Sequence, residues 1–260
     1  MVDQSLPFRQ AAYTLNKGAT FWFTGLSGAG KSTLSGALKA KLDVMLGDDK
    51  KVFILDGDVI RTGLNKGLGF SAEDRAENIR RISEVSKLFA LSGQIVFVAF
   101  ISPYSKDRDF GKTIHRDANL PFYECFINSS LDVCESRDVK GLYKKARAGE
   151  IKNFTGISDP YEAPENPDLD VRTDSLTLEQ SVDYVLKRIL DDRIVVSNKE
   201  PKIADSLIEE NLTEEEQKEI AELPSIEVDT EQAEYIQTLG QGWAAPLDKF
   251  MDEMQLLEVM

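Results

Sequence analysis

Gly25-Leu26-Ser27-Gly28-Ala29-Gly30-Lys31-Ser32 is the stretch that decides the fold of this 260-residue chain. The apolar residues 19–23 before it predict a buried strand, and residues 32–42 after it predict a helix. Glycines between a strand and a helix let backbone N–H groups face a phosphate at the helix N-terminus. There Lys31 can reach the outer phosphates and the Ser32 hydroxyl can hold Mg²⁺. We therefore expect a nucleoside triphosphate site, and the flanking elements make a plain Gly/Ser-rich loop the weaker interpretation.

A second apolar strand, predicted at residues 51–55, ends in Asp56-Gly57-Asp58. Ligands of open α/β sheets bind at the carboxyl ends of strands. Two carboxylates there can orient Mg²⁺ or accept a proton from an attacking hydroxyl, and phosphoryl transfer needs mainly positioning and charge neutralisation. An isolated Asp-Gly-Asp is usually a turn. The strand before it and the basic Arg61 after it favour a site.

The remaining pattern alternates between strands and helices. Apolar spacing predicts helices over residues 74–92, 131–137 and 176–194, and near-continuous apolar runs predict strands over 95–101 and 122–127. Such alternation predicts right-handed βαβ units and a doubly wound parallel sheet. The basic run 137–152 has two interpretations: a solvated helix face, or a lid whose cations close over phosphates.

Composition favours a soluble intracellular protein. The hydrophobic content of 42% is enough for one substantial core, no apolar run reaches the length of a transmembrane helix, and residues 1–10 lack the apolar stretch of a signal peptide. Cys125 and Cys134 are expected as buried free thiols rather than a disulfide. With His115 as the only histidine, a zinc site is not expected, and no motif marks His115 as a general base.

All of the excess negative charge lies in the last quarter of the chain. Residues 200–260 hold 17 acidic and 3 basic residues, whereas the preceding residues hold 28 of each. This acidity argues against nucleic-acid binding by the tail. Residues 209–226 are typical of a linker, with a short helix expected over 212–223.

The motifs along residues 5–192 resemble those of the adenylylsulfate kinase (APS kinase) family, in the same order. Besides the phosphate loop they are Leu55-Asp56-Gly57-Asp58 with Arg61, Gly63 to Ser71, Arg75 to Arg81, Ile101-Ser102-Pro103-Tyr104, Arg137 to Glu150, and Phe154 to Glu162. One departure is Val59, where the family usually has asparagine, so a backbone contact rather than a side-chain contact is expected there. The resemblance implies a P-loop fold with a five-stranded parallel sheet, helices on both faces and a basic lid. It also implies transfer of the γ-phosphate of ATP to the 3′-hydroxyl of adenosine 5′-phosphosulfate (APS), giving PAPS for sulfate assimilation.

The resemblance assigns roles to individual residues. Lys31, Asp58, Asp56 and Ser102 are the expected catalytic set, with Asp58 orienting or deprotonating the hydroxyl, Asp56 and Ser32 on the Mg²⁺, and the roles of the two aspartates open to exchange. Because direct transfer needs no covalent step, Ser102 is not expected to be an obligatory nucleophile. The ATP site is expected to comprise Gly25, Ser27, Gly28, Ala29, Gly30, Lys31, Ser32, Thr33 and Arg137. The APS site is expected to comprise Asp58, Arg61, Phe70, Arg75, Asn78, Ile101, Ser102, Lys140 and Phe154, with Phe70 and Phe154 as two faces of a clamp on the adenine.

The expected organisation is a kinase domain at 1–195, an acidic linker at 196–226 and, at 227–260, a segment resembling the opening of the ATP sulfurylase module of bifunctional PAPS synthases. That segment carries none of the catalytic motifs of the module. A cytoplasmic homodimer without nucleic-acid or membrane partners is expected. Two alternatives remain: another small-molecule kinase with the same loop and lid, or a nucleotide-binding regulatory remnant without turnover.

Overall fold

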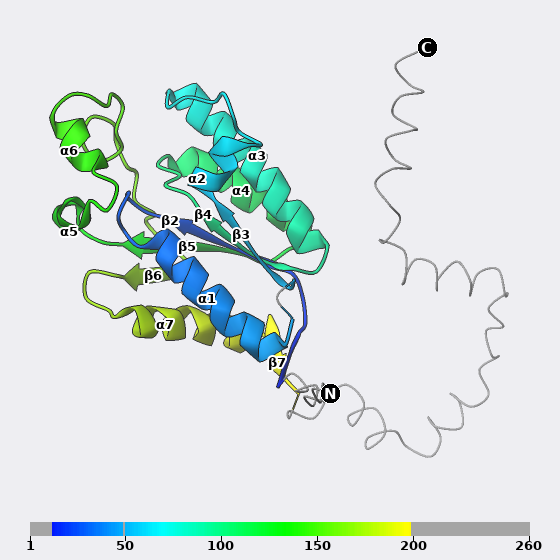
Figure 1. Cartoon of the computed structure of the whole chain (residues 1–260). Coiled ribbons are helices and arrows are strands. Elements are labelled where there is room, and N and C mark those ends of the chain that lie inside the picture. The colour runs from blue at the N-terminus through cyan, green and yellow to red at the C-terminus, as the bar shows by residue number, and fades with distance from the viewer. Residues whose placement is uncertain (1–11, 49, 199–260) are drawn as a thin grey trace, which may run out of the picture. The chain divides into compact units, whose positions relative to one another are not determined.

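A five-stranded parallel sheet forms the centre of the computed structural model, which describes residues 12–48 and 50–198 (Figure 1). The elements along the chain are β1 (Tyr13–Leu15), β2 (Ala19–Thr24), α1 (Lys31–Leu46), β3 (Val52–Asp56), α2 (Gly57–Thr62), α3 (Ala72–Leu91), β4 (Ile95–Ala99), α4 (Ser105–Asp117), β5 (Phe122–Asn128), α5 (Leu131–Arg137), α6 (Leu142–Arg147), β6 (Leu169–Arg172), α7 (Leu178–Asp191) and β7 (Val195–Ser197).

The strand order β3-β4-β2-β5-β6 places β2 at the middle of the sheet. The chain builds β3 and β4 on one side of β2 and then crosses to build β5 and β6 on the other. Such a reversal leaves a crevice at the carboxyl ends of the central strands, where α/β proteins bind their ligands. The segment after β2 is the phosphate loop, so the topology positions the predicted site.

Alternate residues of the central strands pack into two separate cores. Phe21 and Phe23 of β2 belong to the cluster that α1 and α7 cover, whereas Trp22 between them packs with Ile79 and Ile82 of α3. This follows from the two-residue period of a strand. The result is a three-layer fold, with α1 and α7 on one face and α3 and α4 on the other (Figure 1). The predicted α/β class, parallel sheet and two-faced cover are confirmed.

The predicted strands and long helices are present with small shifts at their ends. The third strand of the sequence analysis ends at Ala99 rather than at residue 101, and the last helix is Leu178–Asp191 rather than 176–194. The sequence analysis did not anticipate α4, β6 or the antiparallel pair of β1 and β7. β1, β6 and β7 have only three or four residues each, too few for a periodic pattern.

Strand β7 includes Val196 and Ser197, the first residues of the expected linker. The linker from residue 199 onward, which includes the helix expected at 212–223, lies outside the described residues, as does the segment 227–260. Cys125 and Cys134 are buried and free, as predicted.

Candidate active site

The phosphate loop runs from the end of β2 to the start of α1. Gly25, Gly28 and Gly30 have φ angles of 152°, 77° and 104°, which L side chains rarely adopt. A Cβ on Gly25 would lie 2.5 Å from the carbonyl oxygen of Ile127, and one on Gly28 would lie 2.9 Å from that of Cys134. These two glycines are therefore required both by their conformation and by the close approach of β5 and α5.

Helix α1 begins at Lys31 with Gly30 as its N-cap, and no side-chain hydrogen bond caps this end. The first N–H groups of a helix have no partner within the helix, and together with the helix dipole they attract an anion. Ser32 and Thr33 lie exposed in this first turn. The loop is thus an anion site at the carboxyl edge of the sheet.

The ammonium of Lys31 lies folded onto the loop. Its Nζ donates to the carbonyl oxygens of Gly25 and Leu26, at 2.8 and 2.7 Å. Burial lowers the pKa of Lys31 from its usual 10.5 to about 8, opposed by the nearby Cys134, Asp56 and Asp58. Both carbonyls are partners that a phosphate oxygen can replace, so the lysine is in reach of an anion in the loop.

Ser32 and Asp56 join the loop to the end of β3. The Ser32 hydroxyl donates to Asp56 Oδ2 at 2.6 Å, and Asp56 Oδ1 accepts from the backbone N–H of Asp58 at 2.9 Å. Asp56 therefore caps α2 with one oxygen and meets the phosphate loop with the other. A hydroxyl and a carboxylate oxygen side by side are ligands that suit Mg²⁺, which also takes oxygens from substrate phosphates.

Asp58 faces the lid instead. Its Oδ2 forms an ion pair with Lys140, which lies in the basic run between α5 and α6. Both side chains are exposed, by 71% for Asp58 and 56% for Lys140. The Asp58 carboxylate is therefore accessible to a substrate hydroxyl, and its partner Lys140 has a long side chain with several rotatable bonds.

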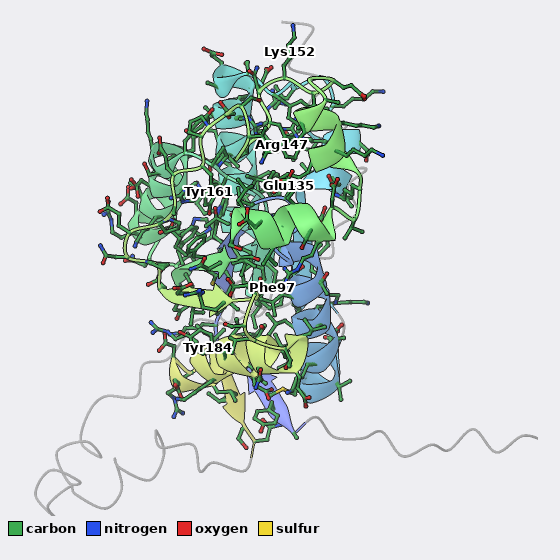
Figure 2. The ribbon with its side chains drawn as sticks, turned by 90° about the vertical axis from the view of Figure 1, so that its left-hand side faces the viewer. Phe97, Glu135, Arg147, Lys152, Tyr161 and Tyr184 are labelled. Carbon is green, nitrogen blue, oxygen red and sulfur yellow. The ribbon has the colours of Figure 1, made fainter. Side chains whose placement is uncertain are left out.

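The basic run contains α6, which is anchored to the phosphate loop by a tyrosine. The Tyr143 hydroxyl donates to the carbonyl oxygen of Ser27 at 2.9 Å, and the ring is buried. Arg147 of α6 pairs with Glu135 of α5 at 2.9 Å (Figure 2). The basic run 137–152 is thus not one continuous helix face. It forms a short folded segment that packs on the phosphate loop and exposes its cations, which supports the lid interpretation.

Arg137, at the end of α5, lies beside the loop. Its guanidinium donates to the carbonyl oxygens of Gly28 and Thr173, at 3.2 and 2.6 Å. The Thr173 hydroxyl in turn donates to the carbonyl oxygen of Ala29 at 2.7 Å. These bonds place Arg137 on the β6 side of the loop, opposite Asp56.

Arg61, Phe70 and Arg75 form a second wall. Arg61 donates to the carbonyl oxygens of Leu68 and Gly69, at 3.0 and 3.1 Å, and its guanidinium carbon lies 4.5 Å from the centre of the Phe70 ring. Arg75 lies 5.6 Å from the same ring. Burial and then the neighbouring Arg75 lower the pKa of Arg61. Phe70 is 56% exposed, so an aromatic face and two cations are available together.

Asn78 and Ser102 are both buried. The Asn78 Oδ1 accepts from Asn65 Nδ2 at 2.8 Å, and the Ser102 hydroxyl accepts from the indole N–H of Trp22 at 3.0 Å. Ser102 has a φ of 41°, a strained value for serine that often marks a functional position. Ile101, half buried, accepts from the Thr24 hydroxyl at 2.7 Å through its carbonyl oxygen.

Phe154 lies differently from Phe70. It is 9% exposed and its ring meets that of Tyr143 edge to face at 5.0 Å. Arg75 connects the two phenylalanine segments, because it donates to the carbonyl oxygen of Phe70 at 3.1 Å and to that of Asn153 at 2.8 Å. The two predicted clamp residues are therefore linked by one arginine, with one ring open and the other packed.

Sequence reasoning gave no role to Tyr143, Thr173 and Asn65, although each fixes a part of this site. Tyr143 and Asn65 lie within quoted motifs, but nothing local shows which backbone or side chain they reach. Thr173 follows the unpredicted β6, so no signal was available for it.

Residues 12–48 and 50–198 hold no cluster of three or more histidine, cysteine or acidic side chains that could bind a metal ion. Across the same ranges, no helix has both the length and the apolar character needed to cross a bilayer.

Comparison with known proteins gives two family matches. The family model described as adenylylsulphate kinase matches residues 17–172, and one described as a PUA-like domain matches residues 196–260. The second match spans all of the expected linker and all of the segment 227–260.

Among curated relatives, an adenylyl-sulfate kinase of Picosynechococcus is 55% identical over 174 residues, which are 67% of this chain and 94% of that protein. One of Saccharomyces cerevisiae is 53% identical over 178 residues, covering 68% and 87% of the two chains. Among solved structures, the APS kinase of Mycobacterium tuberculosis in complex with AMPPNP and APS has a TM-score of 0.62 at 46% identity, covering 66% of this chain and 96% of that one.

Proposed function

The chain belongs to the adenylylsulphate kinase family and is an adenylyl-sulfate kinase, a transferase; we propose that its residues act on ATP and APS in the roles set out below. In the reaction, the 3′-hydroxyl oxygen of APS bonds to the γ-phosphorus of ATP as the bond to the β,γ-bridging oxygen breaks. The products are PAPS and ADP, and the hydroxyl proton goes to a protein carboxylate.

The observation that carries this proposal is the contact between the phosphate loop and the end of β3. The hydrogen bond of 2.6 Å from Ser32 to Asp56 fixes a carboxylate beside the helix N-terminus that would hold the phosphates. Asp58, two residues on, is the exposed carboxylate next to it. Phosphoryl transfer needs this combination of an anion nest, a metal-side carboxylate and a group that orients the nucleophile.

Ser32 and Asp56 are the residues that would hold Mg²⁺. The fit is chemical, since both supply oxygen ligands and Mg²⁺ commonly uses one or two protein oxygens together with phosphate oxygens. When bound, the ion would neutralise charge on the β- and γ-phosphates. Lys31 would add its own charge to the same phosphates by exchanging the carbonyls of Gly25 and Leu26 for phosphate oxygens.

Asp58 would accept the proton of the 3′-hydroxyl. Both carboxylate oxygens of Asp56 accept hydrogen bonds, one from Ser32 and one from the backbone of α2. Asp58 is therefore the better placed of the two to accept a proton. Lys140 forms an ion pair with Asp58, and an acceptor anion would offer the lysine a different partner. Ser102 keeps its hydroxyl on Trp22, and this favours a positioning role over covalent chemistry.

Arg61, Arg75 and Asn78 would bind the phosphosulfate of APS, and Phe70 and Phe154 would face its adenine. The guanidinium groups of Arg75, which is buried, and of Arg61, which is half-buried, favour a dianionic acceptor over a neutral one. Arg137, beside Gly28 and Thr173, would stack on the ATP adenine. To stack on the adenine of APS, the Phe154 ring must either move away from the Tyr143 ring or contact the adenine while it keeps its edge-to-face contact with Tyr143.

For the acidic C-terminal region we propose a relationship to the second module of bifunctional PAPS synthases. The PUA-like match over 196–260 and the resemblance of residues 227–260 to the start of an ATP sulfurylase module support a chain related to the bifunctional PAPS synthases. We further propose a homodimer acting in the cytoplasm. Light scattering of the full chain tests the dimer. An assay for APS synthesis from ATP and sulfate should find no sulfurylase activity in this chain, because residues 227–260 carry none of the catalytic motifs of that module.

The central experiment is a steady-state assay of PAPS formation by the full chain with ATP, Mg²⁺ and APS. AMP, which lacks the sulfate, is the matched alternative acceptor. Turnover with APS and little with AMP is the expected result. Preference for AMP would support a nucleoside monophosphate kinase instead, and ATP binding without turnover on either acceptor would support the regulatory alternative.

A further inference from the structure

Asp159 lies in the turn that follows Phe154, one of the two rings proposed to face the adenine of APS. Its backbone N–H donates to the carbonyl oxygen of Phe154 at 3.1 Å, and its carbonyl oxygen accepts from the N–H of Gly156 at 2.8 Å. The backbone of Asp159 is therefore held by hydrogen bonds in both directions, and its side chain starts from a fixed position.

The Asp159 carboxylate contacts two other segments of the proposed acceptor site. Its Oδ2 accepts from the Tyr104 hydroxyl at 3.0 Å and lies 3.7 Å from Nε of Arg75. The side chains of Asp159 and Arg75 are only 18% and 8% exposed. The carboxylate is thus a partly buried counter-charge on the guanidinium that would bind the phosphosulfate.

Arg75 keeps a guanidinium nitrogen available for a ligand. Its Nε donates to the carbonyl oxygen of Phe70 and its Nη2 to that of Asn153, whereas its Nη1 meets no hydrogen-bond acceptor in residues 12–48 and 50–198. An anion bound by Nη1 would lie across a single guanidinium group from the Asp159 carboxylate. Because this position is shielded from water, the repulsion between the two anions is stronger than between exposed charges.

The proposed reaction supplies a competitor for this position. Its product ADP matches the acceptor APS except that a terminal phosphate replaces the terminal sulfate. Sulfate carries one negative charge, whereas a terminal phosphate carries about 1.5 to 2 near pH 7. Arg61 and Arg75 alone would therefore attract ADP more strongly than APS. A nearby negative charge opposes the additional charge of ADP, and such a repulsive element is a common source of specificity.

We propose that Asp159 is a specificity-determining residue, whose charge beside Arg75 makes the acceptor site prefer a phosphosulfate over a 5′-diphosphate. The inference rests on the proposed binding of the phosphosulfate by Arg75. Asp159 need not touch the substrate, because it acts through its field at the bound anion. It distinguishes the two acceptors by charge, which is the property in which sulfate and phosphate differ most.

The test measures how both ligands bind to the acceptor site of the full chain with Asp159→Asn. At saturating ATP, inhibition by ADP that is competitive with APS reports ADP in the acceptor site. We expect the ratio of this Ki to the KM for APS to fall about tenfold, the scale of one unit charge several ångströms away in a partly buried site. Asparagine keeps the size of the side chain and an oxygen that can accept from Tyr104.

Two controls isolate the charge. Tyr104→Phe removes the hydrogen bond to Asp159 and keeps the carboxylate, so its ratio should stay close to the parent value. The second control is a ligand, the β-fluoro analogue of ADP, whose terminal group carries a single charge as sulfate does. In Asp159→Asn, the Ki of this analogue should change by the same factor as the KM for APS. Melting temperatures show whether each variant folds.

The direction of the change separates selection by charge from support of Arg75. If Asp159 only held Arg75 in place, its loss would weaken attraction most for the more highly charged ADP, and the ratio would rise. An unchanged or raised ratio in folded Asp159→Asn would therefore overturn the inference, as would the absence of competitive inhibition by ADP in that variant. An equal fall in Tyr104→Phe would also overturn it, since the hydrogen bond rather than the charge would then be responsible.

Arg75→Gln tests the function on which the inference rests. It removes the guanidinium charge and should raise the KM for APS. If that KM is unchanged in the folded variant, the proposed role of Arg75 is wrong and the inference falls with it. If Arg75→Gln raises the KM for APS while Asp159→Asn leaves the ratio unchanged, only the inference is overturned.

Discussion

The phosphate loop and the proposed APS site differ in how far their functional side chains are exposed. Lys31 is 9% exposed, and its loop is held by backbone hydrogen bonds, by Tyr143 and by Thr173. Across the site, Asp58 is 71% exposed and Phe70 is 56% exposed. The nucleotide side thus has its lysine packed into the loop, whereas the acceptor side combines buried groups such as Arg75 and Phe154 with the open side chains of Asp58 and Phe70.

This difference separates two ways of contributing to a reaction. A packed, desolvated charge such as Lys31 stabilises a transition state without reorganisation, and its loss should be costly. Exposed groups such as Phe70 gain their effect when the acceptor and lid cover them, so their loss should appear mainly in acceptor binding. The changes below test this difference, from the largest expected effect to the smallest.

Lys31→Ala should produce the largest effect, a fall in kcat of about 10³-fold, at the upper end of what one electrostatic group contributes. The reason is that nothing else in the loop carries a positive charge. Lys41→Ala is the matched control, since Lys41 lies on the same helix but pairs with Asp183 at 2.6 Å on the surface. Near-normal kcat in a folded Lys31→Ala variant would refute the phosphate-loop assignment.

Asp58→Asn should lower kcat by about 10²-fold or more, the usual scale of general-base help, and leave ATP binding largely intact. Asp56→Asn is its comparison and should instead raise the Mg²⁺ concentration needed for half-maximal rate, because Asp56 and its partner Ser32 are the proposed ligands of the ion. Kinetics at several Mg²⁺ concentrations separate the two. If Asp56→Asn costs more in kcat without changing the Mg²⁺ dependence, the roles are exchanged.

Phe70→Ala and Phe154→Ala test the two rings against each other. Each should raise the KM for APS about ten- to a hundredfold if it stacks on the adenine. Phe154→Ala should also lower the melting temperature, because its ring is buried on Tyr143 and large-to-small changes leave a cavity. Phe70→Ala should melt almost as the parent does. An equal rise of KM for both substrates in Phe154→Ala would mean that this ring is only core packing.

The pH dependence reports the buried lysine. Burial lowers the Lys31 pKa to about 8, so the charged form that the phosphates need is lost as pH rises through that value. We expect kcat/KM for ATP, which reports the free enzyme, to fall up to about tenfold per pH unit above 8. In kcat the fall should begin at higher pH, because bound phosphates favour the charged lysine. Burial raises the pKa of the neighbouring Cys134 thiol. A flat kcat/KM profile from pH 7 to 10 would contradict this assignment.

The sequence predicted the phosphate loop, the sheet class and the carboxylate pair because each depends on local order: an apolar strand, then glycines, then a helix. It did not predict that Phe154 would be buried on Tyr143, or that Thr173 would hold Ala29, since these contacts join segments distant in the chain. The pairing of Asn65 with Asn78 is of the same kind. Residue types on loops indicate chemistry, whereas their partners depend on tertiary packing.

Deletion of residues 200–260 should have the smallest effect. The catalytic, ATP-site and APS-site residues all lie between Gly25 and Phe154, and β7, the last described strand, ends at Ser197. The removed segment holds 17 acidic and 3 basic residues, so close approach to anionic substrates would be unfavourable. PAPS formation by residues 1–199 beside the full chain is the measurement, with circular dichroism as the check on folding. A folded 1–199 variant that loses more than about tenfold in activity, about 1.4 kcal/mol of barrier, would show that the acidic region completes or orders the acceptor side. The exposure of Asp58 and Phe70 would then describe the kinase domain without that region.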